Sequence, residues 1–129
     1  MLRSGILNPQ ILSLLARVRH TNTLVIADRG FPYWPEIETV DISLVDGVPR
    51  VLEVFKAIRA NYVIGHIWMA EEFSGANKAR SRSELSAAIE GIPLTFEPHI
   101  EFKKRVPRAI GLIRTGDTIQ YANMILESA

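Results

Sequence analysis

Segments with helical periodicity alternate with short apolar segments along this chain, and this alternation limits its fold more than any other feature. Asn8 and Pro9 are typical of a helix start, and apolar side chains follow at helical spacing through Val18. The next apolar run, residues 23–27 (TLVIA), is short and β-branched, which predicts a buried strand. Because the alternation continues along the chain, we predict one α/β domain over residues 1–129, with a mixed, largely parallel sheet.

The same periodicities predict the remaining elements. Further strands are expected at residues 39–44, 62–69, 93–97 and 109–114, with a final extended segment at 121–126. Helices are expected at residues 49–60, 81–90 and 99–106, and a loop or short turn at residues 71–76. In sheets of this kind ligands bind beyond the carboxyl ends of the strands, so Asp28, directly after the first strand, marks a candidate site.

The charge balance argues against several classes of partner. The 129 residues include 15 Lys or Arg and 14 Asp or Glu, a net charge of +1, which predicts no basic surface for nucleic acid or an anionic membrane. No apolar run approaches the roughly 20 residues of a membrane span, and none resembles a signal peptide. The lack of cysteine excludes disulfides and thiolate metal sites. We therefore expect a cytoplasmic protein that binds a small neutral molecule or another copy of itself.

The three histidines are the side chains best suited to acid–base chemistry near neutral pH. His66 lies within an apolar strand, so we interpret it as a core or interface residue. His20 follows the first helix and His99 opens a later one, where a histidine also serves purely structural roles. The residues alone do not decide between a catalytic and a structural role for His20 and His99. No dinucleotide, P-loop, zinc-protease or nucleophile-elbow motif is present in the chain.

Separate blocks of the chain, in the right order, resemble the ribose pyranase and fucose mutarotase family. Residues 4–32, which include His20 and Asp28, are similar to the opening of that family, with Arg19 in place of a glycine and Arg29 in place of a small residue. The other similar blocks are residues 40–49 (VDISLVDGVP), 69–72 (MAEE), 99–103 (HIEFK) and 113–126 (IRTGDTIQYANMIL).

Two positions favour the ribose branch of this family. The ribose branch has a histidine at the position of His99, where the fucose branch tends to have arginine. The sequence Tyr121-Ala122-Asn123 resembles the Y-A-N of the ribose branch rather than Y-G-N. Phe31 and Pro32, in contrast, are closer to the fucose branch.

The resemblance implies a three-layer α/β/α fold and a cofactor-free, metal-free interconversion of sugar ring forms or anomers, with D-ribose as the closest substrate. It implies that His20 is the proton donor, while Asp28 either accepts an imidazole proton from His20 or binds sugar hydroxyls. The substrate-binding residues that it implies are Asp28, His99, Lys103, Tyr121, Ala122 and Asn123. It also implies a ring-shaped homo-oligomer, a pentamer or decamer, with the site between neighbouring subunits.

This chemistry needs only an acid and a base, because ring opening removes a proton from the anomeric hydroxyl and adds one to the ring oxygen. Two alternatives remain: a mutarotase for L-fucose or another sugar, and a non-catalytic sugar-binding module associated with transport. Arg19 and Arg29 raise the further alternative of an anionic sugar. Tyr33 and Trp34 either pack within their loop or stack on the sugar.

Overall fold

Six strands form one mixed sheet in the computed structural model, which describes residues 1–129. The strands are β1 (Thr23–Ala27), β2 (Glu38–Asp41), β3 (Ile64–Ala70), β4 (Leu94–Glu97), β5 (Gly111–Arg114) and β6 (Met124–Ser128). Their spatial order is β2-β5-β1-β6-β3-β4. Only β6 runs antiparallel to its neighbours, β1 and β3, which confirms the prediction of a mixed, largely parallel sheet.

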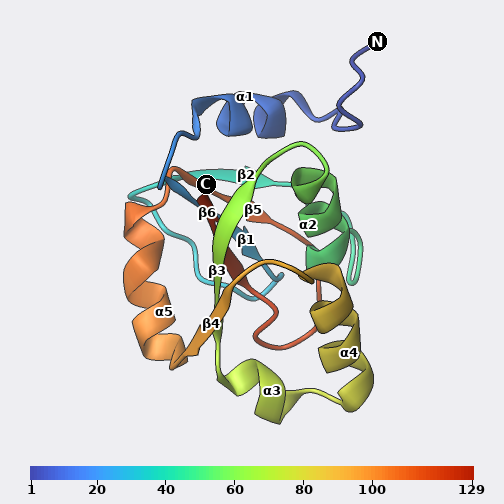
Figure 1. The fold of residues 1–129 in the computed structure, drawn as a ribbon, viewed down its shortest axis with the longest axis vertical. Helices are drawn as coiled ribbons and strands as arrows, with labels where there is room; N and C mark the ends of the chain where they lie inside the picture. Colours follow the sequence, from blue (N-terminus) through green and yellow to red (C-terminus); the bar gives the residue numbers. More distant parts are fainter.

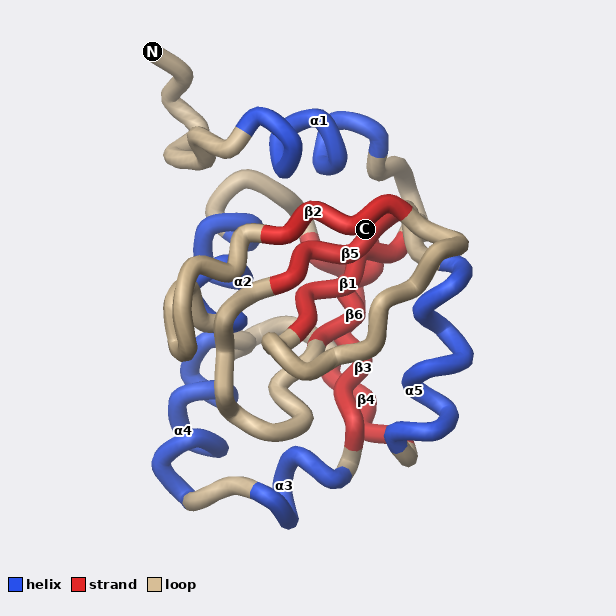
Figure 2. Tube along the Cα trace, turned by 180° about the vertical axis from the view of Figure 1, so that it is seen from behind, coloured by secondary structure: helices blue, strands red, loops and turns tan.

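Helices cover both faces of this sheet. They are α1 (Pro9–Arg17), α2 (Val51–Arg59), α3 (Glu72–Ala76), α4 (Ala79–Ala88), α5 (His99–Arg105) and the 3-10 turn η1 (Val106–Arg108). Figure 1 shows α2 and α4 on one side of the sheet and α5 on the other, with α1 across one end and α3 at the opposite end. Figure 2 shows the same division from behind, so the three-layer α/β/α arrangement is confirmed. None of the helices has the length and apolar character needed to span a lipid bilayer.

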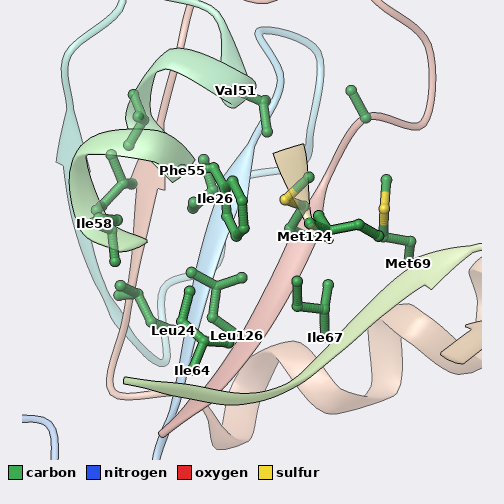
Figure 3. Close-up of a cluster of buried hydrophobic side chains, with 14 of the residues drawn as sticks. Leu24, Ile26, Val51, Phe55, Ile58, Ile64, Ile67, Met69, Met124 and Leu126 are labelled. Atoms are coloured by element: carbon green, nitrogen blue, oxygen red, sulfur yellow. The ribbon is translucent and has the colours of Figure 1, made fainter. Parts of the chain in front are cut away.

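Two apolar clusters fill the spaces between the layers. The larger cluster joins the sheet to α1, α2 and α4, and Figure 3 shows Phe55 of α2 facing Leu24 and Ile26 of β1. The smaller cluster lies under α5, where Phe102 is buried with Val25. Because β1 is covered on both faces, its side chains from Leu24 onward are all buried, which explains why its sequence is continuously apolar.

Side chains fix both ends of α1. Asn8 accepts a hydrogen bond from the Ile11 N–H at 2.9 Å, and Pro9 occupies the first helical position, as the sequence predicts. At the other end, Arg19 Nη1 donates to the carbonyl oxygens of Ala16 and Val18. Arg19 therefore satisfies carbonyls that the end of a helix leaves without intrahelical partners.

Three elements differ from the sequence prediction. Residues 72–76 form the short helix α3 rather than a loop or turn. β2 ends at Asp41 because residues 44–48 turn back tightly, with Gly47 in the left-handed region at φ 81°. β6 begins only at Met124, because the backbone of Tyr121 is also left-handed, at φ 57°, and interrupts the extended segment.

Candidate functional site

An open pocket of about 340 Å³ lies at the end of the sheet where β1 stops and β6 starts. Its lining residues come from the loop after β1, the first residue of α5 and the segment before β6: Asp28, Gly30, Phe31, Pro32, His99, Gln120, Tyr121 and Asn123. Because β6 is antiparallel, its beginning meets the carboxyl ends of the parallel strands. This is the place where ligands bind in open α/β sheets, as Asp28 predicts.

The carboxylate of Asp28 is held from two sides. Gly30 donates its N–H to Asp28 Oδ1 at 3.0 Å, and Asn123 Nδ2 donates to Oδ2 at 3.2 Å. Asn123 Oδ1 in turn accepts the Asp28 N–H at 2.7 Å, so the two side chains form a closed pair. Burial raises the pKa of the Asp28 carboxyl, and these hydrogen bonds oppose that rise only in part.

His99 forms an aromatic wall of the pocket. Its ring meets Tyr121 edge-on at 5.1 Å between centroids, and it also contacts the rings of Phe31 and Phe102. Burial, followed by the charge of Lys103, lowers the pKa of the His99 imidazole, so the ring is neutral at pH 7. Its Nε2 is buried and has no hydrogen-bond partner within the chain, an unmet requirement that a ligand hydroxyl can satisfy.

Glu72 positions His99 from the neighbouring helix. The His99 N–H donates to both carboxylate oxygens of Glu72, at 2.9 and 3.1 Å, which ties the start of α5 to the start of α3. Its charge also raises the pKa of His99 and opposes burial in part. The sequence did not predict this role, although Glu72 belongs to the family-like block MAEE at residues 69–72.

Tyr121 projects from a strained backbone. A bulky residue rarely adopts a φ of 57°, and such strain tends to occur where function requires a particular side-chain direction. Its neighbour Gln120 also lines the pocket, and no pattern in the sequence marked it. The Gln120 carbonyl accepts a hydrogen bond from Asn77 Nδ2 at 2.8 Å, which holds this segment against the end of α3.

Other predicted site residues lie outside the lining. Lys103 lies one turn along α5 and reaches His99 only through its charge. Ala122 is buried on the core side, and its N–H donates to the Ile119 carbonyl. Tyr33 is exposed, and Trp34 packs against Phe31 rather than facing the pocket.

His20 is not brought to this pocket within one chain. It is exposed and precedes β1, whereas Asp28 follows β1. The five residues of β1 alone span roughly 16 Å, at about 3.3 Å per residue. A direct contact between the His20 imidazole and the Asp28 carboxylate of the same chain is therefore ruled out, so the expectation that Asp28 accepts a proton from His20 is wrong within one chain.

Neither of the two unusual arginines reaches the pocket. Arg19 binds carbonyls at the end of α1, and Arg29 forms an ion pair with Asp46 at 2.8 Å on the surface. His66 lies on β3, where its Nε2 is 2.8 Å from Thr95 Oγ1, away from the pocket lining. The pocket itself contains no lysine or arginine.

Comparison with known proteins identifies relatives along the whole chain. Residues 1–129 match the profile of the RbsD / FucU transport protein family. D-ribose pyranases from Geobacillus kaustophilus (strain HTA426) and Geobacillus thermodenitrificans (strain NG80-2) are 42% and 40% identical to this chain over 128 residues. These matches cover 99% of this chain and 93% and 96% of the two relatives.

Solved structures show the same fold. Bacillus subtilis RbsD complexed with D-ribose has a TM-score of 0.93 at 29% identity, covering 100% of this chain and 98% of that one. The fucose mutarotase from Streptococcus pneumoniae in complex with L-fucose has a TM-score of 0.80 at 22% identity, covering 98% of this chain and 94% of the other. The resemblance predicted from the sequence blocks is thus confirmed over the full length, and the chain belongs to the RbsD / FucU family.

Proposed function

We propose that this chain is a cofactor-free sugar mutarotase of the pyranase type, which interconverts the ring forms of D-ribose by general acid–base catalysis. The observation that carries the proposal is that one open pocket is lined by both a partly buried carboxylate with a raised pKa and a neutral histidine. Full-length similarity to D-ribose pyranases at 42% and 40% identity supports ribose as the substrate.

The reaction requires two proton transfers and no redox step. A base takes the proton of the anomeric hydroxyl, the bond between the anomeric carbon and the ring oxygen breaks, and an acid protonates that oxygen to give the open-chain aldehyde. When a different hydroxyl of the open chain attacks the aldehyde, the alternative ring form results. When the same hydroxyl attacks the other face of the aldehyde, the other anomer results. We assign the acid to His20, as the family resemblance implies, and a base or binding role to His99.

The remaining pocket residues suit a neutral polyol. Asp28, Tyr121 and Asn123 offer carboxylate, phenol and amide groups, and the Asn123 amide retains a second N–H and a second lone pair after binding Asp28. No cation lines the pocket, and Arg19 and Arg29 have other partners. This charge distribution argues against a sugar phosphate or sugar acid. Lys103 and Ala122 also contribute to sugar binding in this proposal, Lys103 from the edge of the pocket and Ala122 through its backbone.

The site requires a second copy of the chain. Because His20 and the pocket lie at opposite ends of β1, the His20 that completes the pocket comes from a neighbouring subunit. Exposed apolar side chains around the pocket loops support such a contact, namely Tyr33, Leu44, Val45, Val48 and Ile100. The proposal includes a closed ring-shaped homo-oligomer, a pentamer or decamer, acting in the cytoplasm, with residues 1–129 as one functional domain.

L-fucose is the second candidate substrate. Phe31 and Pro32, which resemble the fucose branch, both line the pocket. The choice between the two sugars therefore depends on direct measurement of exchange.

Saturation-transfer NMR of anomer and ring-form exchange tests the proposal. With EDTA present, the protein should speed the exchange of D-ribose well above the buffer rate, and that of L-fucose less. A protein that binds ribose but leaves its exchange unchanged is a binding module, and this result would overturn the proposed activity. Preference for L-fucose would keep the mutarotase reaction and replace the substrate.

A further inference from the structure

Arg114 binds the backbone of the loop that forms one wall of the pocket. It is the last residue of β5, and its register partner in β1 is Ala27, directly before Asp28. Arg114 Nη1 donates to the carbonyl oxygens of Asp28 and Arg29, both at 3.3 Å, and Nη2 donates to the Pro32 carbonyl at 3.2 Å. One guanidinium therefore holds both ends of the segment 28–32.

This segment supplies four of the pocket-lining residues, whereas Arg114 itself stays outside the lining. Near its start the segment has other bonds, because the Arg29 N–H donates to the Asp117 carbonyl and the Gly30 N–H to the Asp28 carboxylate, both at 3.0 Å. Pro32 has no N–H to contribute. Apart from a long hydrogen bond from the Phe31 N–H to the Asp28 carbonyl at 3.5 Å, the far end of the segment depends on the bond from Arg114 to Pro32 and on the buried ring of Phe31.

The bonding pattern requires the shape of a guanidinium. Its planar fork reaches three carbonyl oxygens in different directions, which the single ammonium centre of a lysine does not reproduce. Asp41 is the register partner of Arg114 in β2, but its carboxylate accepts two hydrogen bonds from Ser43. The hydrogen-bonding capacity of Arg114 is therefore directed at the pocket loop.

Arg114 acts on the loop rather than on the charge of Asp28. Burial and the charge of Asp117 raise the pKa of the Asp28 carboxyl, and Arg114 bonds to the backbone carbonyl of residue 28 rather than to its carboxylate. Loss of Arg114 is thus expected to move the carboxylate by releasing the backbone that carries it. This distinction separates a positioning role from an electrostatic one.

We propose that Arg114 is a positioning residue that sets the place of the Asp28 carboxylate and of the Phe31–Pro32 wall relative to His99. Its kinetic consequence rests on the proposed mutarotase function. Its structural consequence, an ordered segment 28–32, is measurable without any activity.

The test compares Arg114→Ala and Arg114→Lys with Arg59→Ala. Arg59 is a matched control because its guanidinium also binds two carbonyl oxygens, those of Ala88 and Glu90, on the α2 and α4 side of the sheet. Two quantities are measured at a temperature where circular dichroism shows each variant folded. They are kcat/KM for ribose ring exchange and the amide hydrogen-exchange rates of Gly30 and Phe31.

Both Arg114 variants should lose kcat/KM by roughly 10- to 100-fold, the scale of a small misplacement of reacting groups. Their Gly30 and Phe31 amides should exchange faster, while Arg59→Ala should match the wild type in both measurements. Added guanidinium ion, below denaturing concentration, should restore part of the activity of Arg114→Ala and should leave the activity of Arg59→Ala unchanged.

Two results would overturn the inference. Wild-type amide exchange at Gly30 and Phe31 in Arg114→Ala would show that the loop does not depend on this side chain. Full kcat/KM in Arg114→Lys would show that positive charge alone suffices. An inactive wild type would instead defeat the proposed function, and the amide-exchange comparison would still decide the role of Arg114.

Discussion

The closed hydrogen-bonded pair of Asp28 and Asn123 is the centre of the site at the scale of single residues. Asn123 is only 3% exposed, and each polar atom of its side chain binds a different group of Asp28. A role as a sugar ligand, predicted from the sequence, is therefore joined by a second role as the partner that orients the carboxylate.

Asn123→Ala should reduce both stability and turnover. It leaves the Asp28 N–H without its acceptor, which costs about 1–3 kcal/mol for a buried donor, and it frees the carboxylate to rotate. Thermal unfolding and kcat measure the two effects. The control is Asn61→Ala, because Asn61 is exposed just after α2 and its side chain donates only to the Ala57 carbonyl of that helix. Equal melting temperatures and equal kcat in the two variants would contradict the assigned pair.

The titration of His99 should occur at lower pH than that of an ordinary histidine. Burial and Lys103 both lower its pKa, so NMR titration of the ring should give a midpoint below about 6.5. Glu72→Gln should lower the midpoint further, and Lys103→Met should raise it. A midpoint at or above the ordinary value would contradict a partly buried ring that is neutral at pH 7.

The lowered pKa of His99 also makes the stability of the fold depend on pH. Because the folded pKa of His99 lies below the unfolded one, the unfolded chain binds more protons between the two values. The neutral ring therefore stabilises the fold at pH values above the unfolded pKa. This stabilisation is lost as the pH falls from the unfolded pKa toward the folded pKa. His99→Phe should reduce this acid sensitivity in urea unfolding measured at several pH values.

Sequence patterns predicted several of the residues that line the pocket, and missed Glu72, which holds His99, and the lining residue Gln120. Asp28 was found because it follows a buried strand, and His99 and Tyr121 because they lie in family-like blocks. Glu72 and Gln120 were missed because their roles depend on contacts between segments far apart in the chain. Periodicity and spacing describe one segment at a time, so they do not report such contacts.

At the scale of elements, the turn at residues 115–117 joins the site to the rest of the fold. Thr115 Oγ1 donates to the Ala27 carbonyl at 2.8 Å, and Asp117 Oδ2 accepts the Val51 N–H at the start of α2 at 2.8 Å. Between them, Gly116 lies directly against the turn at residues 44–48. The family-like TGD sequence therefore fixes β1, α2 and this turn together.

Gly116→Ala should be strongly destabilising. A Cβ there would lie 2.4 Å from the Val45 carbonyl oxygen and 2.5 Å from that of Val48, so the backbone of the neighbouring turn has to move. The expected cost is about 1–3 kcal/mol or more in the free energy of unfolding, which urea denaturation measures. Gly75→Ala, in α3 with nothing within 4 Å, should be neutral or stabilising by up to about 1 kcal/mol. Similar losses in both variants would show that the close approach at Gly116 is not tight.

The elements that sequence predicted best were those covered on both sides. β1 matches its predicted bounds because its burial on both faces produces an unbroken apolar run. The predictions failed near the pocket, at α3 and at the start of β6, where short helices and a left-handed tyrosine follow from tertiary contacts rather than from local preference. Strain at a site of this kind is set by the surrounding fold.

At the scale of the whole molecule, the two ends of the sheet carry different parts of the proposed reaction centre. Figure 1 shows α1, which precedes His20, at one end and α3, next to the pocket, at the other. With His20 as the proposed acid, a single chain therefore holds only part of the proposed site. Light scattering at micromolar concentration should show a closed homo-oligomer, and a monomer that exchanges ribose would contradict the shared site.

The most direct test of the shared site is complementation between two inactive variants. His20→Ala should lose roughly 10²–10⁴-fold in activity as the loss of a general acid, and Asp28→Asn should be inactive because it alters the pocket. When the two are unfolded together and reassembled in equal amounts, about one site in four should pair an intact His20 with an intact pocket, by random mixing around a ring. Saturation-transfer NMR should then show ribose exchange recovering to about a quarter of the wild-type rate. Mixed oligomers that stay as inactive as the separate variants would contradict a reaction centre built from two copies of the chain.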